Sequence, residues 1–340
     1  MGRALGHEVA LFGKQRSDAL RMPYSLDVKN FDFAIFIIYE TQDLPELPYL
    51  ARLLNEMPKS RRIVIDCWGR YNDTIRVEHD SNHFEKLDGH KGWEWIEAFR
   101  TLSDRILQPT SAPLRDDVHP FLFHGYDPGA VVRPLNWALR AARTWIRGNR
   151  ARKPYGVVYV GHNWQRWTQI KSFLEAIEPL RTSLGPICLA GWRWDERLDW
   201  AVERGIDGVD VDPLLLKRLE VETKPFIPFE QVIDFESKSH FSPIFHRPLF
   251  NHLRLVTNRA FETFCADTIP LLMLPDNIVK EIYGEDALLL APGNDIAARV
   301  QDMRRRPEKY CEAVRKTRAH LAAHHSYRRR FEELLTLLES

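Results

Sequence analysis

Short runs of consecutive apolar residues, alternating with helical patterns, constrain the fold of this chain more than any other feature. Strands that are apolar on both sides belong inside parallel sheets covered on both faces. In the first half, the expected strands are residues 8–12, 33–38, 62–65, 105–108 and 121–123, and the expected helices are 47–57 and 93–102. This order predicts one sheet with a helix in each crossover.

The same alternation begins again after a polar, proline-containing joint at residues 151–154. The second half has expected strands at 156–160, 186–190, 269–274 and 287–290, and expected helices at 165–180, 196–203, 232–238, 260–264, 277–283 and from about 295 and 307. A chain of 340 residues suits two domains better than one. We therefore predict an α/β fold with two Rossmann-like, doubly wound domains, residues 1–150 and 151–340, that face a cleft.

The first nine residues look like the end of a helix that runs into a second strand. The strand and glycine turn expected before them are absent from this sequence. Because the first strand is central in a doubly wound sheet, we expect a gap in the N-terminal core. Either the true start lies upstream, or the N-terminal domain is truncated and binds its acceptor poorly.

Composition excludes some classes of partner. The formal charge is +1, with 48 basic and 47 acidic residues, so nucleic acid is not the expected partner. No apolar run reaches the roughly 18 residues that span a bilayer, and no signal peptide is apparent. The four cysteines are widely spaced, which suits reduced thiols in a cytoplasmic protein.

The segment from Asn251 to Glu262 carries the chemistry most suited to a nucleotide diphosphate. Arg254 and Arg259 offer forked donors for phosphate oxygens, and Glu262 can accept from two vicinal ribose hydroxyls. An apolar strand at 269–274 follows directly. The alternative is an Arg–Glu salt bridge that caps a helix.

A second candidate lies where the strand at 156–160 ends. Gly161 and Asn163 form the turn into a helix that also carries Arg166. A glycine at this point lets the backbone approach a ligand, and the free N–H groups of the helix favour an anion. A tight strand-to-helix turn without any ligand is the alternative.

These motifs resemble the donor-binding segment of GT-B glycosyltransferases, in particular the group related to the spore protein CgeB. That group carries Leu-Asn-x-x-Arg and then Arg-x-Phe-Glu; here Phe250 replaces the leucine, and Asn251, Arg254, Arg259 and Glu262 are in register. The passage 124–128 and the closing stretch 325–331 also resemble the family. The resemblance implies that Arg254 and Arg259 hold the diphosphate and Glu262 the ribose.

Two positions depart from the family pattern. Asp267 stands where a glycine is expected before the strand, and Arg254 stands where large retaining GT-B enzymes have the first of two glutamates. The resemblance implies a glycosyltransferase that needs no metal or other cofactor and moves a sugar from a nucleotide diphosphate to an unknown acceptor. The alternatives are a non-catalytic nucleotide-sugar-binding or scaffold protein and a nucleotide-sugar epimerase.

Asp66 is the candidate catalytic base, because it ends a parallel strand on the side where such sheets bind ligands. A turn or helix cap is the alternative role. Asp73, His79 and His83 follow in the same polar stretch. No metal site is predicted: Asp210 and Asp212 match an Asp-x-Asp pattern, but the proline after Asp212 favours a helix N-cap. His320, His324 and His325 are expected at the surface.

Overall fold

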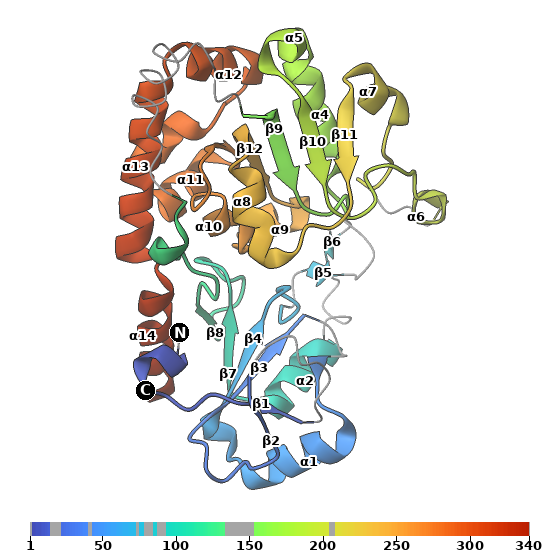
Figure 1. Ribbon diagram of the computed structural model, residues 1–340. Coiled ribbons are helices and arrows are strands. Elements are labelled where there is room, and N and C mark those ends of the chain that lie inside the picture. The colour runs from blue at the N-terminus through green and yellow to red at the C-terminus, as the bar shows by residue number, and fades with distance from the viewer. Residues whose placement is uncertain are drawn as a thin grey trace.

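The computed structural model describes residues 2–13, 22–39, 43–72, 75–77, 84–86, 93–132, 153–203 and 208–339. It has two lobes, one above the other in Figure 1, each built on a parallel sheet. This confirms the predicted α/β class with two Rossmann-like domains. The expected boundary at residue 150, the joint at 151–152, and the candidates Asp73, His79 and His83 lie outside the described residues.

The N-terminal sheet has four parallel strands in the order β3-β4-β7-β8. Its strands are β3 (Ala34–Ile38), β4 (Arg62–Asp66), β7 (Arg105–Gln108) and β8 (Val118–Pro120). The last strand therefore precedes the expected 121–123. Its helices are α1 (Leu47–Glu56) and α2 (Trp93–Leu102), with 3-10 turns η1 (Gly2–Leu5), η4 (Lys59–Arg61) and η5 (Pro128–Ala130), and β5 (Ile75–Val77) pairs antiparallel with β6 (Phe84–Lys86).

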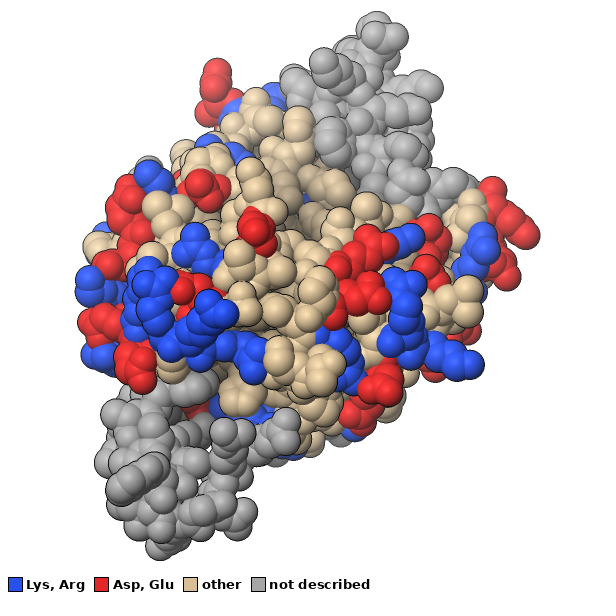
Figure 2. Space-filling model, turned by 90° about the horizontal axis from the view of Figure 1, so that it is seen from above, with Lys and Arg blue, Asp and Glu red and all other residues tan. Residues whose placement is uncertain are grey.

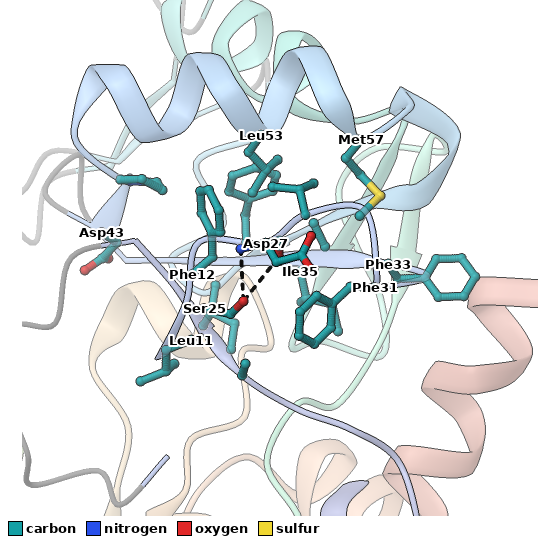
Figure 3. Close-up of a pocket in the computed structure, with 16 residues that line it drawn as sticks. Leu11, Phe12, Ser25, Asp27, Phe31, Phe33, Ile35, Asp43, Leu53 and Met57 are labelled. Atoms are coloured by element: carbon teal, nitrogen blue, oxygen red, sulfur yellow. Dashed lines mark hydrogen bonds between the residues drawn. The ribbon is translucent and has the colours of Figure 1, made fainter. Parts of the chain in front are cut away.

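The expected strand at 8–12 does not join this sheet. Only β1 (Leu11–Phe12) forms, and it pairs with β2 (Tyr24–Ser25) in a separate two-stranded ribbon. Among the described strands, β3 is therefore an edge, and its Ile35 and Ile37 are each 40% exposed. A cavity of about 300 Å³, lined mostly by apolar side chains, lies between β3, α1 and the ribbon (Figure 3).

The C-terminal sheet has five parallel strands in the order β11-β10-β9-β12-β13. They are β9 (Tyr155–Val160), β10 (Ile187–Ala190), β11 (Val221–Lys224), β12 (Ser239–Phe245) and β13 (Ile269–Met273). The helices are α4 (Trp167–Ile177), α5 (Arg181–Leu184), α6 (Asp199–Glu203), α7 (Pro213–Arg218), α8 (Val232–Glu236), α9 (Pro248–His252), α10 (Arg259–Glu262), α11 (Asp276–Tyr283), α12 (Ile296–Arg305), α13 (Pro307–His324) and α14 (Tyr327–Glu339), with 3-10 turns η6 (Glu178–Leu180), η7 (Phe229–Gln231) and η8 (Glu285–Leu290). The expected strand at 287–290 is thus a 3-10 turn.

The closing helix α14 returns to the N-terminal lobe and runs beside it in Figure 1. Its Leu334 and Leu338 pack with Ile63 and Leu107 of the first sheet. Arg105 donates to the carbonyl oxygens at the end of the same helix, at 2.8 and 2.9 Å. Burial of these leucines ties the two lobes together.

The carboxyl ends of the two sheets face each other. Thr110, two residues beyond β7, forms an isolated bridge with Leu255, and its hydroxyl donates to the carbonyl oxygen of Leu253 at 2.9 Å. The backbone N–H of Val256 donates to the carbonyl of Pro109 at 2.8 Å. Parallel sheets bind ligands at their carboxyl ends, so a site between the lobes can draw on both.

The described helices include none that is long and apolar enough to cross a membrane. All four cysteines are buried and unbridged. On the face shown in Figure 2, basic and acidic side chains lie interspersed and do not form one basic surface.

Candidate functional site

The turn after β9 is built by two glycines in close contact. A Cβ on Gly191 would lie 2.0 Å from the carbonyl oxygen of Gly161, and Gly191 has φ +137°. The same carbonyl accepts from the indole N–H of Trp194 at 2.9 Å. The ends of β9 and β10 are therefore held together. Gly161 forms the tight turn that was the alternative to a ligand site, and its role in donor binding stays a prediction.

Asn163 is fully buried in this turn. Its side-chain amide donates to the carbonyl of Val209 at 3.1 Å, and its backbone N–H donates to Trp192 at 3.1 Å. Its Oδ1 atom has no partner among the residues that the structure describes. Asn163 therefore positions the loop that carries His162 and Arg166.

His246 and Arg247 lie directly after β12 and were not singled out from the sequence. Phe241 pairs with Val157, so the same register continued past the strand ends places these two residues beside the turn after β9. Both are buried, with exposed fractions of 2% and 8%. The available signal was the mostly apolar run 241–245, because polar residues that directly follow a parallel strand lie where such sheets bind ligands.

Arg247 is a buried guanidinium held by aromatic rings. Its guanidinium carbon lies 4.7 Å from the ring centroid of Trp68 and 5.3 Å from that of Phe250. Nε and Nη1 find no hydrogen-bond partner within the described part of the chain. Burial, and then the positive charge of Arg166, lower the pKa of Arg247 to about 9, so it remains charged at neutral pH.

Positive charge converges at this point. Desolvation by the surrounding protein, followed by the charges of Arg166, Arg247 and Arg259, lowers the pKa of His162 to about 4. Burial and Arg166 lower the pKa of His246 to the same region. The two imidazoles are thus neutral at pH 7 beside three guanidinium groups, and this arrangement favours an anion.

The two arginines predicted from the sequence are both in ion pairs. Arg254, in the left-handed region with φ +53°, donates to Glu281 at 2.8 Å. Arg259 donates to the buried Glu236 at 3.1 Å and lies 3.6 Å from Glu262. The salt-bridge alternative is therefore present in the geometry, and the diphosphate role of Arg254 stays a prediction.

The carboxyl groups around Arg259 are desolvated. Burial raises the pKa of Glu236, and Arg259 opposes that shift. Burial likewise raises the pKa of Glu262, whose side chain is 12% exposed. Asn251 lies on α9 with its Oδ1 lacking a partner among the described residues. The ribose role of Glu262 and the donor role of Asn251 remain predictions.

Asp66 is fully buried, and its carboxylate holds the loop that follows β4. It accepts from the backbone N–H groups of Trp68 at 3.3 Å and Tyr71 at 2.7 Å, and from the side chain of Gln108 at 2.9 Å. Burial raises its pKa, and these hydrogen bonds oppose the shift. Such contacts are those of the turn cap, and the catalytic role is an untested prediction.

Asp267, which replaces the family's glycine, makes a structural ion pair. Its carboxylate lies 3.6 Å from Nζ of Lys153, and the two side chains are 5% and 6% exposed. Lys153 also donates to the carbonyl of Ser239 at 2.8 Å. This ion pair therefore joins the segment just before β9 to the turn before β13.

The other residues considered in the sequence, Asp212 and His325, make structural contacts. Asp212 caps α7 by accepting from the N–H groups of Leu214 and Leu215, as predicted. Within the described ranges, no group of three His, Cys, Asp or Glu side chains is placed to hold a metal ion. His325 was expected at the surface but is only 9% exposed, because it packs against Phe261 and Arg330.

The fold and its likeness to solved structures define the class. An α-glucosyltransferase in complex with UDP-glucose and DNA containing an abasic site matches with a TM-score of 0.53 and 13% identity, over 95% of this chain and 83% of its own. The Anabaena protein HepE in complex with UDP gives 0.52 and 10%, over 90% and 78%. The E. coli structure described as trehalose-6-phosphate bound with UDP-2-fluoro glucose gives 0.54 and 10%, over 91% and 74%. At these identities the likeness establishes the fold, which is the GT-B fold.

The family follows from the sequence match. The model of the glycosyl transferase-like family matches residues 161–336, more than half of the chain, and the chain belongs to that family. The match begins at the turn after β9 and includes Arg166, Arg247 and Arg259. No curated protein matches the sequence significantly.

Proposed function

We propose that the protein transfers a sugar from a nucleotide diphosphate donor to an acceptor held by the N-terminal lobe. The diphosphate binds to Arg166, Arg247 and Arg259 at the carboxyl ends of β9 and β12, and Glu262 accepts from the ribose. The observation that carries this proposal is the cation at Arg247, held by two aromatic rings with two guanidinium nitrogens unpartnered among the described residues.

The chemistry follows from the charges. Breaking the bond between sugar and diphosphate leaves extra negative charge on the departing phosphate oxygens. Fixed guanidinium groups in a partly desolvated site stabilise that charge without having to reorganise. The proposed reaction needs no metal, because the three arginines supply the positive charge.

The comparisons support a uridine nucleotide as the first ligand to test, since the structures of HepE and of the α-glucosyltransferase contain UDP or UDP-glucose. The α-glucosyltransferase structure also contains DNA. For this chain, the balanced charge and the mixed surface in Figure 2 favour a different acceptor, such as a glycan, a lipid-linked sugar or a small molecule.

Calorimetric titration with UDP, GDP, ADP, CDP and dTDP, in the presence of EDTA, tests the donor site. We expect one of them to bind the wild type, and Arg247→Ala to weaken that binding about a hundredfold, as for a charge-assisted phosphate contact. The matched control is Arg218→Ala, because Arg218 at the end of α7 is exposed and pairs with Glu178 of η6. If no nucleoside diphosphate binds the wild type, the proposal is wrong. If the protein binds a sugar nucleotide but neither transfers nor hydrolyses its sugar, the non-catalytic scaffold alternative is favoured. If it converts the sugar nucleotide without any acceptor, the epimerase alternative is favoured.

A further inference from the structure

The loop Cys67–Asn72 of the N-terminal lobe lies against α9 of the C-terminal lobe. A Cβ on Gly69 would lie only 2.7 Å from a methyl group of Leu253, and Gly69 has φ +70°, a backbone conformation that favours glycine. Trp68 meets Phe250 edge to face, with ring centroids 5.8 Å apart. This contact brings an acceptor-side loop to the strand end that carries Arg247.

Trp68 and Phe250 hold the guanidinium of Arg247 in place, whereas carboxylates hold the neighbouring arginines. Arg254 is paired with Glu281, and Arg259 with Glu236, so carboxylates offset their charges. Arg247 lies over two aromatic faces instead. A ring face attracts and orients a cation but carries no net charge, so the full positive charge stays available to an anionic ligand.

Trp68 itself is positioned by Asp66. The carboxylate of Asp66 accepts from the N–H groups of Trp68 and Tyr71, and Gln108 of β7 holds the same carboxylate. The loop is therefore fixed to two strands of the N-terminal sheet. Arg70, in the same loop, lies 4.4 Å over the ring of Trp95 on α2, which adds a second anchor.

From these contacts we propose that Trp68 is a positioning residue for donor binding: the N-terminal lobe holds Arg247 in its phosphate-binding orientation across the interface. Asp66 acts one step further back, by fixing the loop. The proposal rests on the proposed donor site, and it assigns part of that site to the lobe that holds the acceptor. Donor affinity then depends on how the two lobes are docked.

A double-mutant cycle on Trp68 and Arg247 tests this, with UDP as the titrant and uridine as the phosphate-free control. We expect Trp68→Ala to weaken UDP binding about tenfold, within the range of a desolvated cation–π contact. Trp68→Phe keeps an aromatic face and should restore most of that loss. In the Arg247→Ala background, Trp68→Ala should have almost no further effect on UDP, and uridine binding should be unchanged throughout.

Met57→Ala controls for general loosening of the N-terminal lobe, because Met57 is 3% exposed in the core of that lobe and lines the cavity beside α1. It should lower the unfolding temperature while leaving the affinity for UDP unchanged. Additive effects of Trp68→Ala and Arg247→Ala would overturn the inference, as would an equal loss in Met57→Ala. If the wild type binds no UDP but another nucleoside diphosphate, the cycle is run with that one. If it binds none, the donor site itself fails, which is a different outcome from additivity.

Discussion

The guanidinium carbon of Arg247 lies 4.7 Å from the ring centroid of Trp68, and the two residues belong to different lobes. Arg247 follows β12 of the sheet proposed to bind the donor, and Trp68 follows β4 of the sheet proposed to bind the acceptor. A contact of this kind couples ligand binding at the carboxyl end of one sheet to the position of the other lobe.

Replacing Arg259 with alanine should destabilise the fold in a pH-dependent way. The change leaves the buried carboxylate of Glu236 without its counter-charge, which costs about 3 kcal/mol of unfolding free energy at neutral pH. Burial already raises the pKa of Glu236 in the folded state, and Arg259 is the main group that opposes the rise. The folded state therefore binds a proton more readily than the unfolded state, so the loss should shrink as pH falls.

Urea unfolding at pH 5.5 and 7.5 measures this difference. Arg259→Ala combined with Glu236→Gln should recover much of the stability at pH 7.5. An equal loss at both pH values would show that the ion pair with Glu236 is not the cause.

Asp66→Asn separates the two roles of this carboxylate. As a turn cap Asp66 accepts hydrogen bonds from Trp68, Tyr71 and Gln108, so the amide should cost about 2 kcal/mol of stability and weaken UDP binding only modestly. If Asp66 is the catalytic base, the variant should bind the donor normally and lose sugar transfer almost completely. Thermal unfolding, UDP titration and a transfer assay on the same variant distinguish the two.

Gly191→Ala and Gly161→Ala should differ sharply in stability. A Cβ at Gly191 meets backbone at 2.0 Å and an unfavourable φ, so we expect a loss of about 3 kcal/mol or failure to fold. A Cβ at Gly161 meets the hydroxyl of Tyr159 at 2.6 Å, and a side chain can move. Comparable unfolding temperatures for the two variants would contradict this account of the turn.

Asp267→Ala should be less stable than the double variant Asp267→Ala with Lys153→Met. The single change leaves the charge of Lys153 buried beside fewer oxygens, which costs about 3 kcal/mol, whereas the double change removes both charges. Chemical denaturation of the three proteins tests the order. A double variant less stable than the single one would contradict the structural role of the pair.

The fold was largely predictable because its strands are continuous apolar runs, as at 62–65 and 156–160, and such runs identify a parallel sheet. The sequence pattern missed β12, which is almost wholly buried but interrupts its apolar residues with serine, histidine and proline. It also failed where burial was partial or the backbone was irregular. β11 (Val221–Lys224) has no fully buried residue, and every second residue along it is charged. The apolar run 287–290 packs as a 3-10 turn against α13.

The site was less predictable, because its cations come from three separate strand or helix ends. Arg259 belongs to a recognisable motif, but Arg247 becomes meaningful only when the register of β9 and β12 places it beside the turn after β9. Its aromatic support comes from Trp68, far away in the sequence. No local pattern contains that contact.

The structure of the complex with UDP, or with whichever nucleoside diphosphate binds, tests the central claim most directly. The account predicts diphosphate oxygens within hydrogen-bond distance of Arg247 and of Arg166 or Arg259, with Trp68 still stacked on the guanidinium. A diphosphate bound elsewhere, with Arg247 unchanged and out of reach, would contradict it.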